Sequence, residues 1–97
     1  MNEKTRNIIT EAHHHYALLW DDLSAKLSDL EAAEWDAIHY AEREDLPESE
    51  WAAADDKVDR AQRERKDCED AMDAIAQLLG NLEHAMDNLI VLKCLNH

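Results

Sequence analysis

Apolar residues recur along the chain at alternating spacings of three and four positions, in two separate stretches. Such spacing keeps an apolar stripe on one side of an α-helix and is typical of a coiled coil. The first stretch comprises Ile9, Ala12, Tyr16, Leu19, Leu23, Lys26, Leu30, Ala33, Ala37 and Tyr40. The second comprises Trp51, Ala54, Val58, Ala61, Arg65, Cys68, Met72, Ile75, Leu79, Leu82, Met86 and Leu89. The pattern predicts two long helices.

The segment between the two stretches reads EDLPESEW and holds the only proline, Pro47. Proline ends one helix and suits the first turn of the next, and Glu48 and Glu50 favour a helix N-terminus. In one domain of residues 1–97 we expect helix 1 over about 3–44, a turn over about 45–49 and helix 2 over about 50–94. A short connection makes long helices antiparallel neighbours. The predicted fold is therefore an all-α, antiparallel two-helix coiled-coil hairpin.

Lys26 and Arg65 are the polar intruders in the two stripes. Folding the chain near residue 46 pairs residue i with roughly 92 − i, which brings both cations into one layer. Two cations cannot share a dry layer, so carboxylates must reach in from flanking positions: Asp22, Asp29, Glu64 or Glu69. We expect a hydrated polar layer that fixes the register; a buried functional site is the alternative.

Gly80 is the position at which the second helix is expected to be weakest. Glycine costs about 1 kcal/mol in a helix interior, and a Gly-Asn pair can end a helix. The stripe nevertheless keeps its phase from Leu79 to Leu82 and Met86. We predict a continuous or slightly kinked helix, with a break at Gly80 and a third helix as the alternative.

The apolar surface is wider than a two-helix hairpin can cover, because each helix buries only one stripe. The surplus side chains beside the stripes form the expected oligomer interface: Trp20, Leu27, Ala71, Leu78, Ala85, Ile90 and Leu92. Dimerisation into a four-helix bundle is the simplest way to cover them. The alternative is that the apolar side chains of residues 71–92 bind a different protein.

The net charge limits the possible partners. The 97 residues carry 23 acids and 10 bases, which gives a net charge of −13. This charge excludes direct electrostatic binding to nucleic acid or anionic lipid and favours a basic protein partner. The apolar runs, such as 17–20 and 89–92, are too short to cross a membrane. The N-terminal segment is polar and cysteines occur only at 68 and 94, so we expect a cytoplasmic protein with reduced thiols.

Three consecutive histidines at 13–15 raise the question of a metal site. Successive helical residues point about 100° apart, so these three side chains cannot converge on one ion. The three- or four-residue spacing of helical metal ligands is met by Glu11 with His14 and by Asp36 with His39. A metal centre in a helical bundle needs its carboxylates on the buried stripe, which here is apolar. We predict solvated helix residues, with no metal and no cofactor.

Motifs for catalysis are missing. The serines at 24, 28 and 49 lack the flanking glycines of a nucleophile elbow, and there is no Gly-rich phosphate loop. Cys68 lies on the stripe, where burial leaves a thiol inert. A thin hairpin also has no concave pocket that excludes water. The sequence predicts a non-enzymatic protein without catalytic residues.

The acids concentrate between residues 20 and 56, where thirteen carboxylates accompany only Lys26 and Arg43. Together with Trp35, these acids form the candidate partner-binding surface: Asp21, Asp22, Asp29, Glu31, Glu34, Asp36, Glu42, Glu44, Asp45, Glu48, Glu50, Asp55 and Asp56. Spaced carboxylates can imitate a phosphate backbone and occupy a basic groove on a partner. The alternative is that they only solvate a helix face.

Ion pairs expected across the hairpin, and the positions of the tryptophans, further define this surface. Three bases of the second helix are expected opposite three acids of the first: Lys57, Arg60 and Arg63 opposite Glu31, Glu34 and Asp36. Trp35 lies off the stripe and is the better interface candidate, of the type enriched at binding hot spots. Trp51 lies on the stripe and is expected in the core.

In general character the chain resembles the small acidic proteins that phages use to disarm bacterial defences, such as DNA mimics and anti-CRISPR proteins. The resemblance rests on length, the acidic stretch from Asp21 to Asp56, and the lack of a catalytic motif or secretion signal. It implies an inhibitor that occludes a nucleic-acid-binding or nuclease component of a bacterial host. The chain is also similar to secreted Trp-x-Gly helical hairpins, but Trp51-Ala52-Ala53 has alanine in place of that glycine, and the final LKCLNH lacks their tyrosine-containing export signal.

Overall fold

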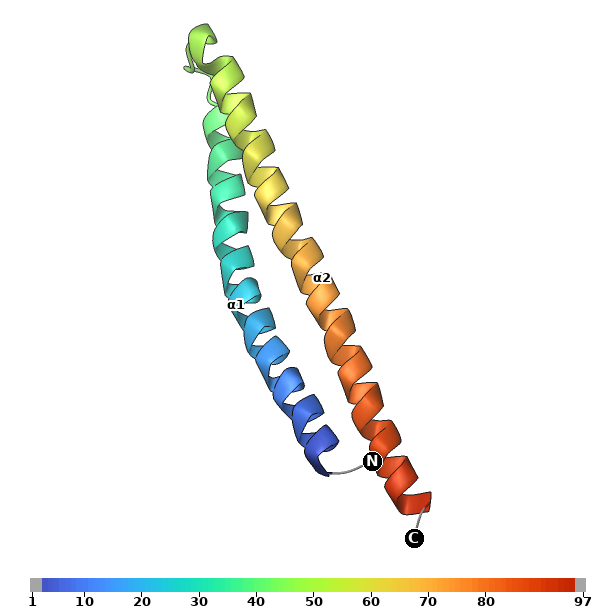
Figure 1. The fold of residues 1–97 in the computed structure, drawn as a ribbon. Coiled ribbons are helices and arrows are strands. Elements are labelled where there is room, and N and C mark those ends of the chain that lie inside the picture. The colour runs from blue at the N-terminus through green and yellow to red at the C-terminus, as the bar shows by residue number, and fades with distance from the viewer. Residues whose placement is uncertain (1–2, 96–97) are drawn as a thin grey trace. The chain divides into compact units, whose positions relative to one another are not determined.

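The chain folds into two helices joined by a short turn (Figure 1). The computed structural model describes the backbone of residues 3–95 and the side chains of residues 3–88. Helix α1 is Glu3–Ala41 and helix α2 is Trp51–Leu95, with a 3-10 turn, η1, at Glu48–Glu50. The described residues contain no strand, which confirms the predicted all-α helical hairpin.

The turn begins earlier than predicted, because α1 ends at Ala41 and not near residue 44. The backbone N–H of Arg43 donates to the carbonyl of Tyr40 and that of Leu46 donates to Arg43, each at 3.3 Å. Pro47 then adopts an extended conformation, with φ −60° and ψ 143°, and its carbonyl accepts from the Glu50 N–H at 2.9 Å. Proline has no N–H and disfavours helix in the preceding residue, so it separates the two helices.

Two compact units divide the chain, and each contains part of both helices. The turn unit is Leu23–Ala71, and the terminal unit is Met1–Asp22 with Met72–His97. The buried apolar side chains among the described residues all belong to the turn unit: Ala37, Leu46, Ala54 and Cys68. The described part of the terminal unit holds only half-buried and exposed side chains.

Contacts between α1 and α2 in the turn unit run antiparallel. The Cys68 thiol donates to the Leu23 carbonyl at 3.4 Å, and the Tyr40 hydroxyl donates to the Glu50 carboxylate at 3.0 Å. Both pairs lie within two residues of the predicted pairing of i with 92 − i. The pairing of Glu34 with Arg65 and the contact of Lys57 with Tyr40 lie seven and five positions beyond the predicted partners, so these contacts confirm the antiparallel arrangement but not the exact register.

The terminal unit is also antiparallel, as two side-chain contacts between α1 and α2 show. The Nε2 atom of His13 lies 3.1 Å from the Glu83 carboxylate, and Thr10 Oγ1 lies 3.9 Å from Met86 Sδ. In both pairs the α2 residue lies four positions beyond the predicted partner. The register of this unit thus differs from the prediction by about one helical turn.

The stripe predicted for α2 is confirmed from Ala54 to Met86, where each of its residues is buried or half-buried. Helix α2 continues through Gly80, and a side chain added at Gly80 would meet nothing within 4 Å. The third-helix alternative is therefore wrong, because the stripe residues on both sides of the glycine keep one helix in phase. Predicted residues at the C-terminal end lie outside the described side chains: Leu89, Ile90 and Leu92.

The stripe predicted for α1 is correct at Ile9 and Ala12, and from Tyr16 onwards it is correct at one position of each heptad and wrong at the other. The positions predicted correctly are Tyr16, Leu23, Leu30 and Ala37. The half-buried residues that alternate with them are Trp20, Leu27, Glu34 and Ala41. The residues predicted in their place are exposed: Leu19, Lys26, Ala33 and Tyr40. Trp20 and Leu27, expected beside the stripe in an oligomer interface, are thus part of the stripe itself.

Arg65 is paired with carboxylates, as expected, but Lys26 lies outside the stripe, so the predicted layer of two cations is wrong. Lys26 is exposed, whereas the Arg65 guanidinium bonds to Glu34 through Nε and to Glu69 through Nη1, the latter at 2.8 Å. The hydrogen bonds that Arg65 donates to Glu69 and Glu34 raise the pKa of Arg65. The Glu34 side chain is only 15% exposed, so a cross-helix ion pair occupies this layer. Glu69 was among the flanking acids expected to reach in.

The ion pair gives a stability prediction. Arg65→Met should lower the midpoint of thermal unfolding, because it leaves the half-buried Glu34 carboxylate without its cation. In Glu34→Leu/Arg65→Met, two apolar residues complete the stripe, so the midpoint should return to that of the wild type or exceed it. Circular dichroism measures both, with Lys26→Met as the exposed control. Equal stability of Arg65→Met and wild type would contradict a structural role for the pair.

Candidate partner-binding surface

The turn unit carries most of the charge of the protein. It contains sixteen acids and seven bases, a net charge of −9 out of −13. Five acids cluster around the turn, and all five are exposed: Glu42, Glu44, Asp45, Glu48 and Glu50. The only base among residues 42–50 is Arg43.

Arg43 forms an ion pair with Asp45, two residues further along the chain. Its Nε and Nη2 atoms bond to the two carboxylate oxygens of Asp45 at 3.1 and 2.9 Å. This bidentate pair lowers the pKa of Asp45, chiefly through the hydrogen bond from Arg43, and raises the pKa of Arg43. The carboxylates of Glu42, Glu44 and Glu48 make no ion pair or hydrogen bond with a described residue. These three carboxylates are therefore free to meet cations from outside.

Glu50 accepts a hydrogen bond from the Tyr40 hydroxyl, which raises the pKa of Tyr40. The hydrogen bond is the larger cause and the negative charge of Glu50 is the second. The neutral phenol donates this bond, so its contribution to stability is complete below the ordinary pKa of tyrosine, about 10. The contribution is lost as the pH rises through the raised pKa of Tyr40.

This hydrogen bond predicts a shift in an alkaline titration. In a Tyr16→Phe background, Tyr40 is the only tyrosine, and its ionisation is followed by tyrosinate absorbance. Glu50→Gln should lower the pKa of Tyr40, because it removes the negative charge and weakens the acceptor. Glu48→Gln is the control and should leave the titration unchanged. An unchanged Tyr40 titration in Glu50→Gln would show that the hydrogen bond does not form in solution.

The remaining predicted acids divide into two groups. The Glu34 carboxylate does not belong to the exposed surface, because it is paired with Arg65. The others are exposed: Asp21 and Asp22 in the terminal unit, and Asp29, Glu31, Asp36, Asp55 and Asp56 in the turn unit. The predicted cross-helix pairing of three bases with Glu31, Glu34 and Asp36 is wrong. Lys57 instead lies over the Tyr40 ring, and Arg60 and Arg63 make no ion pair with a described residue.

Two of the three tryptophans are exposed in the turn unit. Trp35 is 63% exposed, as predicted, and its ring meets His39 edge-on with a centroid distance of 4.2 Å. Trp51 is 54% exposed, so its predicted place in the core is wrong. It is the first residue of α2 and α1 ends at Ala41, so no further turn of α1 lies opposite its ring. The Trp51 indole N–H donates to the Leu46 carbonyl at 3.1 Å, which fixes the ring beside the turn.

The side of the turn unit on which a residue lies follows from its position relative to the buried stripe. Each helical residue is rotated about 100° from the one before, so residues that follow a stripe residue lie on one side and residues that precede one lie on the other. In antiparallel helices the same sense of rotation leads to the same side. Tyr40 and Lys57 each precede a stripe residue, and the Lys57 ammonium lies 5.8 Å from the Tyr40 ring centroid. This contact agrees with the rule.

The opposite side of the turn unit carries Trp35. Trp35 directly follows the stripe residue Glu34, whereas Trp51 comes seven positions before the stripe residue Val58 and is therefore in phase with the stripe, beyond the end of α1. Exposed acids follow stripe residues on the side of Trp35: Glu31, Glu42, Asp55 and Asp59. Lys66 follows the stripe residue Arg65 on the same side. The carboxylates of these four acids make no ion pair or hydrogen bond with a described residue.

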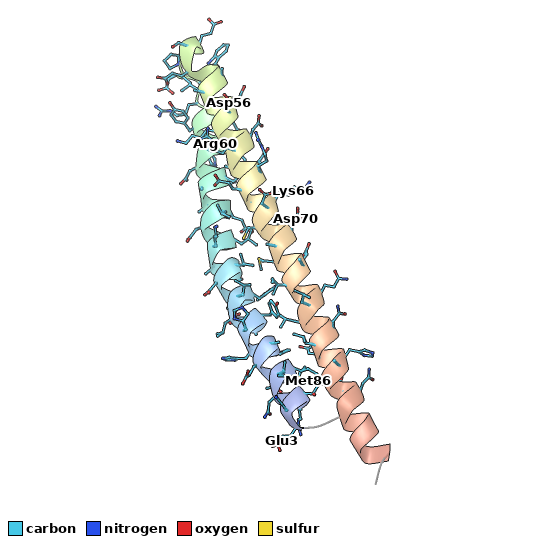
Figure 2. All side chains as sticks on the ribbon, in the orientation of Figure 1. Glu3, Asp56, Arg60, Lys66, Asp70 and Met86 are labelled. Carbon is cyan, nitrogen blue, oxygen red and sulfur yellow. The ribbon has the colours of Figure 1, made fainter. Side chains whose placement is uncertain are left out.

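A basic segment of α2 adjoins this acidic surface. Half of the ten bases lie within residues 57–66, and Arg63, Arg65 and Lys66 line a shallow open depression with Asp59 and Gln62. Figure 2 shows Lys66 and Asp70 on the side of α2 that is directed away from α1. Within the turn unit, the turn is therefore strongly acidic and a short stretch of α2 is basic.

No group of three or more His, Cys, Asp or Glu side chains in the described part of the chain is arranged to hold a metal ion. Neither helix, over its described residues, has a stretch long and apolar enough to cross a bilayer.

Of the other residues predicted in the oligomer interface, Ala71 and Ala85 are half-buried and Leu78 is 41% exposed.

Comparison with known proteins leaves the residues themselves as the guide to function. The sequence matches no protein-family model, and neither the curated proteins nor the solved structures give a significant match.

Proposed function

We propose that the chain is a non-catalytic, cytoplasmic binding protein that inhibits a basic, nucleic-acid-handling protein by covering its anion-binding surface. The observation that carries the proposal is the set of exposed carboxylates at the turn that pair with no cation among the described residues: Glu42, Glu44 and Glu48. A surface that binds phosphates presents lysine and arginine, and such a surface attracts spaced carboxylates by the same electrostatics. A CRISPR effector component is one partner of this kind.

The exposed tryptophans support binding rather than solvation alone. A helix face that only keeps a protein dissolved needs charge but no large aromatic side chains. Trp35 and Trp51, which belong to the same unit as these acids, are each more than half exposed. Tryptophans at the centre of an interface, surrounded by charged residues, are the usual composition of binding hot spots. The carboxylates would then steer the encounter and the rings would supply contact area.

Charge reversal tests the proposal. Glu42→Lys/Glu44→Lys/Glu48→Lys spares Asp45 and Glu50, which hold Arg43 and Tyr40. We expect this variant to lose at least about tenfold in affinity for a basic partner, with a weaker dependence on salt. The measurement is capture of partners from a bacterial lysate on immobilised protein at low and at high salt, followed by titration with the purified partner and its nucleic acid as competitor.

A matched control separates location from total charge. Glu11→Lys/Asp73→Lys/Asp87→Lys changes the net charge equally, at exposed positions of the terminal unit. We expect it to bind like the wild type apart from a small general salt effect. Equal losses in the two variants would show that net charge alone drives the binding. A partner that survives high salt in both would contradict the proposal.

A structural or adaptor role is the second candidate, and the terminal unit favours it. The described part of this unit contains no buried side chain, whereas Ile8, Leu18 and Leu78 are 58, 52 and 41% exposed. Exposed apolar side chains of this number are normally covered by another surface. A second copy of the chain, packed into a four-helix bundle, would cover them, and a different protein would do so in an adaptor.

The Leu78→Asp variant distinguishes these roles. If the chain dimerises through the terminal unit, the variant should be monomeric in analytical ultracentrifugation where the wild type is a dimer, because a carboxylate cannot be buried there unpaired. Leu78→Ala is the milder control and should weaken the dimer less. Binding of a basic partner should persist in the monomer, since the turn unit is unchanged. A monomeric wild type would rule out self-association and leave the adaptor role to be judged by the captured proteins.

A further inference from the structure

We propose that a second copy of the chain packs against one side of the terminal unit, the side that carries no charged residue. This interface gives the structural role considered above a definite location, and it does not depend on the basic partner proposed for the turn unit. The two sides of the terminal unit differ in charge, and helical phase assigns each residue to a side as it does in the turn unit.

One side of the terminal unit is acidic and is crossed by polar contacts between the helices. Thr10 on α1 and Glu83 on α2 each follow a stripe residue, and each contacts a half-buried residue of the other helix, Met86 and His13 respectively. Residues that follow the stripes therefore share one side in this unit too. The acids that follow a stripe residue here are Asp21, Asp73, Glu83 and Asp87.

The other side holds the residues that precede a stripe residue. Between residues 8 and 19 of α1, and between 74 and 85 of α2, none of these is an aspartate, glutamate, lysine or arginine. The side chains of Ile8, Leu19 and Leu78 are 58, 37 and 41% exposed. We name this side the neutral flank, and it comprises Ile8, His15, Leu19, Ala74, Leu78, Asn81 and Ala85.

Charge limits what covers the neutral flank. Charged residues make up 34% of the chain and the net charge is −13, so two copies repel each other wherever their acids meet. On the neutral flank two copies meet without placing carboxylates against carboxylates. A basic protein is instead attracted to the acidic side and the acidic turn, and it gains no ion pair on the neutral flank. The charge of this flank therefore matches a second neutral flank better than a basic partner.

Side-chain size also suits a symmetric contact. A twofold interface uses the same patch on both copies, so large side chains must find space on an identical surface. On α2 the exposed Leu78 lies between Ala74 and Ala85 along the neutral flank. Each copy thus offers both a projecting leucine and the space beside alanines that a leucine requires. Two flanks in contact form a four-helix layer and cover apolar side chains that one hairpin leaves in solvent.

Two exposed alanines of α2 provide a matched pair of variants. Ala74 lies on the neutral flank, whereas Ala76 follows the stripe residue Ile75 and lies on the acidic side. Glutamate at either position adds one negative charge and keeps a good helix-forming residue. We expect a wild-type dimer in sedimentation equilibrium, with a dissociation constant raised at least about tenfold in Ala74→Glu, because symmetry buries two unpaired carboxylates. Ala76→Glu should dimerise like the wild type.

Two adjacent leucines of α1 provide a second pair. Leu19 lies on the neutral flank, whereas Leu18 is 52% exposed and lies about 200° from the stripe residue Tyr16, on the outer side of α1. Leu19→Glu should dissociate the dimer and Leu18→Glu should not. Circular dichroism checks that all four variants remain helical, as expected for substitutions at exposed positions.

The outcomes separate this interface from the acidic turn. A monomeric wild type, equal dissociation in both members of a pair, or a dimer that survives in Ala74→Glu and Leu19→Glu would overturn the inference. Added salt should tighten the dimer, because it screens the repulsion between two acidic copies, whereas it weakens binding of a basic partner. A monomeric chain that still binds a basic protein leaves the proposed function standing. A dimer that binds no basic protein leaves the interface standing.

Discussion

A pair of helices can bury one stripe of side chains from each partner, and this limit governs the rest of the structure. In the turn unit, small residues occupy the most buried positions, among them Ala37, Ala54 and Cys68. Small side chains let two backbones approach, so their neighbours in the stripe are shielded only in part. Every other side chain meets solvent or a partner. The surface of such a protein is therefore large relative to its core, and its function depends on how charge and aromatic rings are distributed over that surface.

The periodicity of the sequence predicted α2 better than α1, for a physical reason. On α2, one set of positions from Ala54 to Met86 is apolar apart from Arg65, and no other set competes with it. On α1, Trp20 and Leu27 compete with Leu19 and Lys26 one position earlier, and each set has one charged member, Lys26 in the earlier set and Glu34 in the later one. Apolar spacing alone does not decide between them. Only the partner helix decides between them, and it selects the set that contains Trp20 and Leu27.

Glu34 and Trp51 show what a single sequence does not reveal about the candidate surface. Glu34 looks like one surface acid among many until Arg65 from the other helix is placed beside it. Trp51 continues the stripe of α2 in sequence, but α1 ends before it can cover the ring. Both depend on contacts between segments far apart in the chain. The acid-rich stretch and the exposure of Trp35, by contrast, follow from local composition and helical phase, and these were predicted.

The charge of the turn unit couples its folding to the ionic medium. With sixteen acids and seven bases close together, the folded unit repels itself, and the unfolded chain relieves that repulsion by spreading out. Added salt screens the repulsion and so should stabilise this part of the fold. The same screening weakens attraction to any cationic surface, so fold and complex respond to ionic strength with opposite sign. A cationic surface bound to the unit also replaces the missing counter-charge, so resistance to unfolding reports occupancy of the acidic turn.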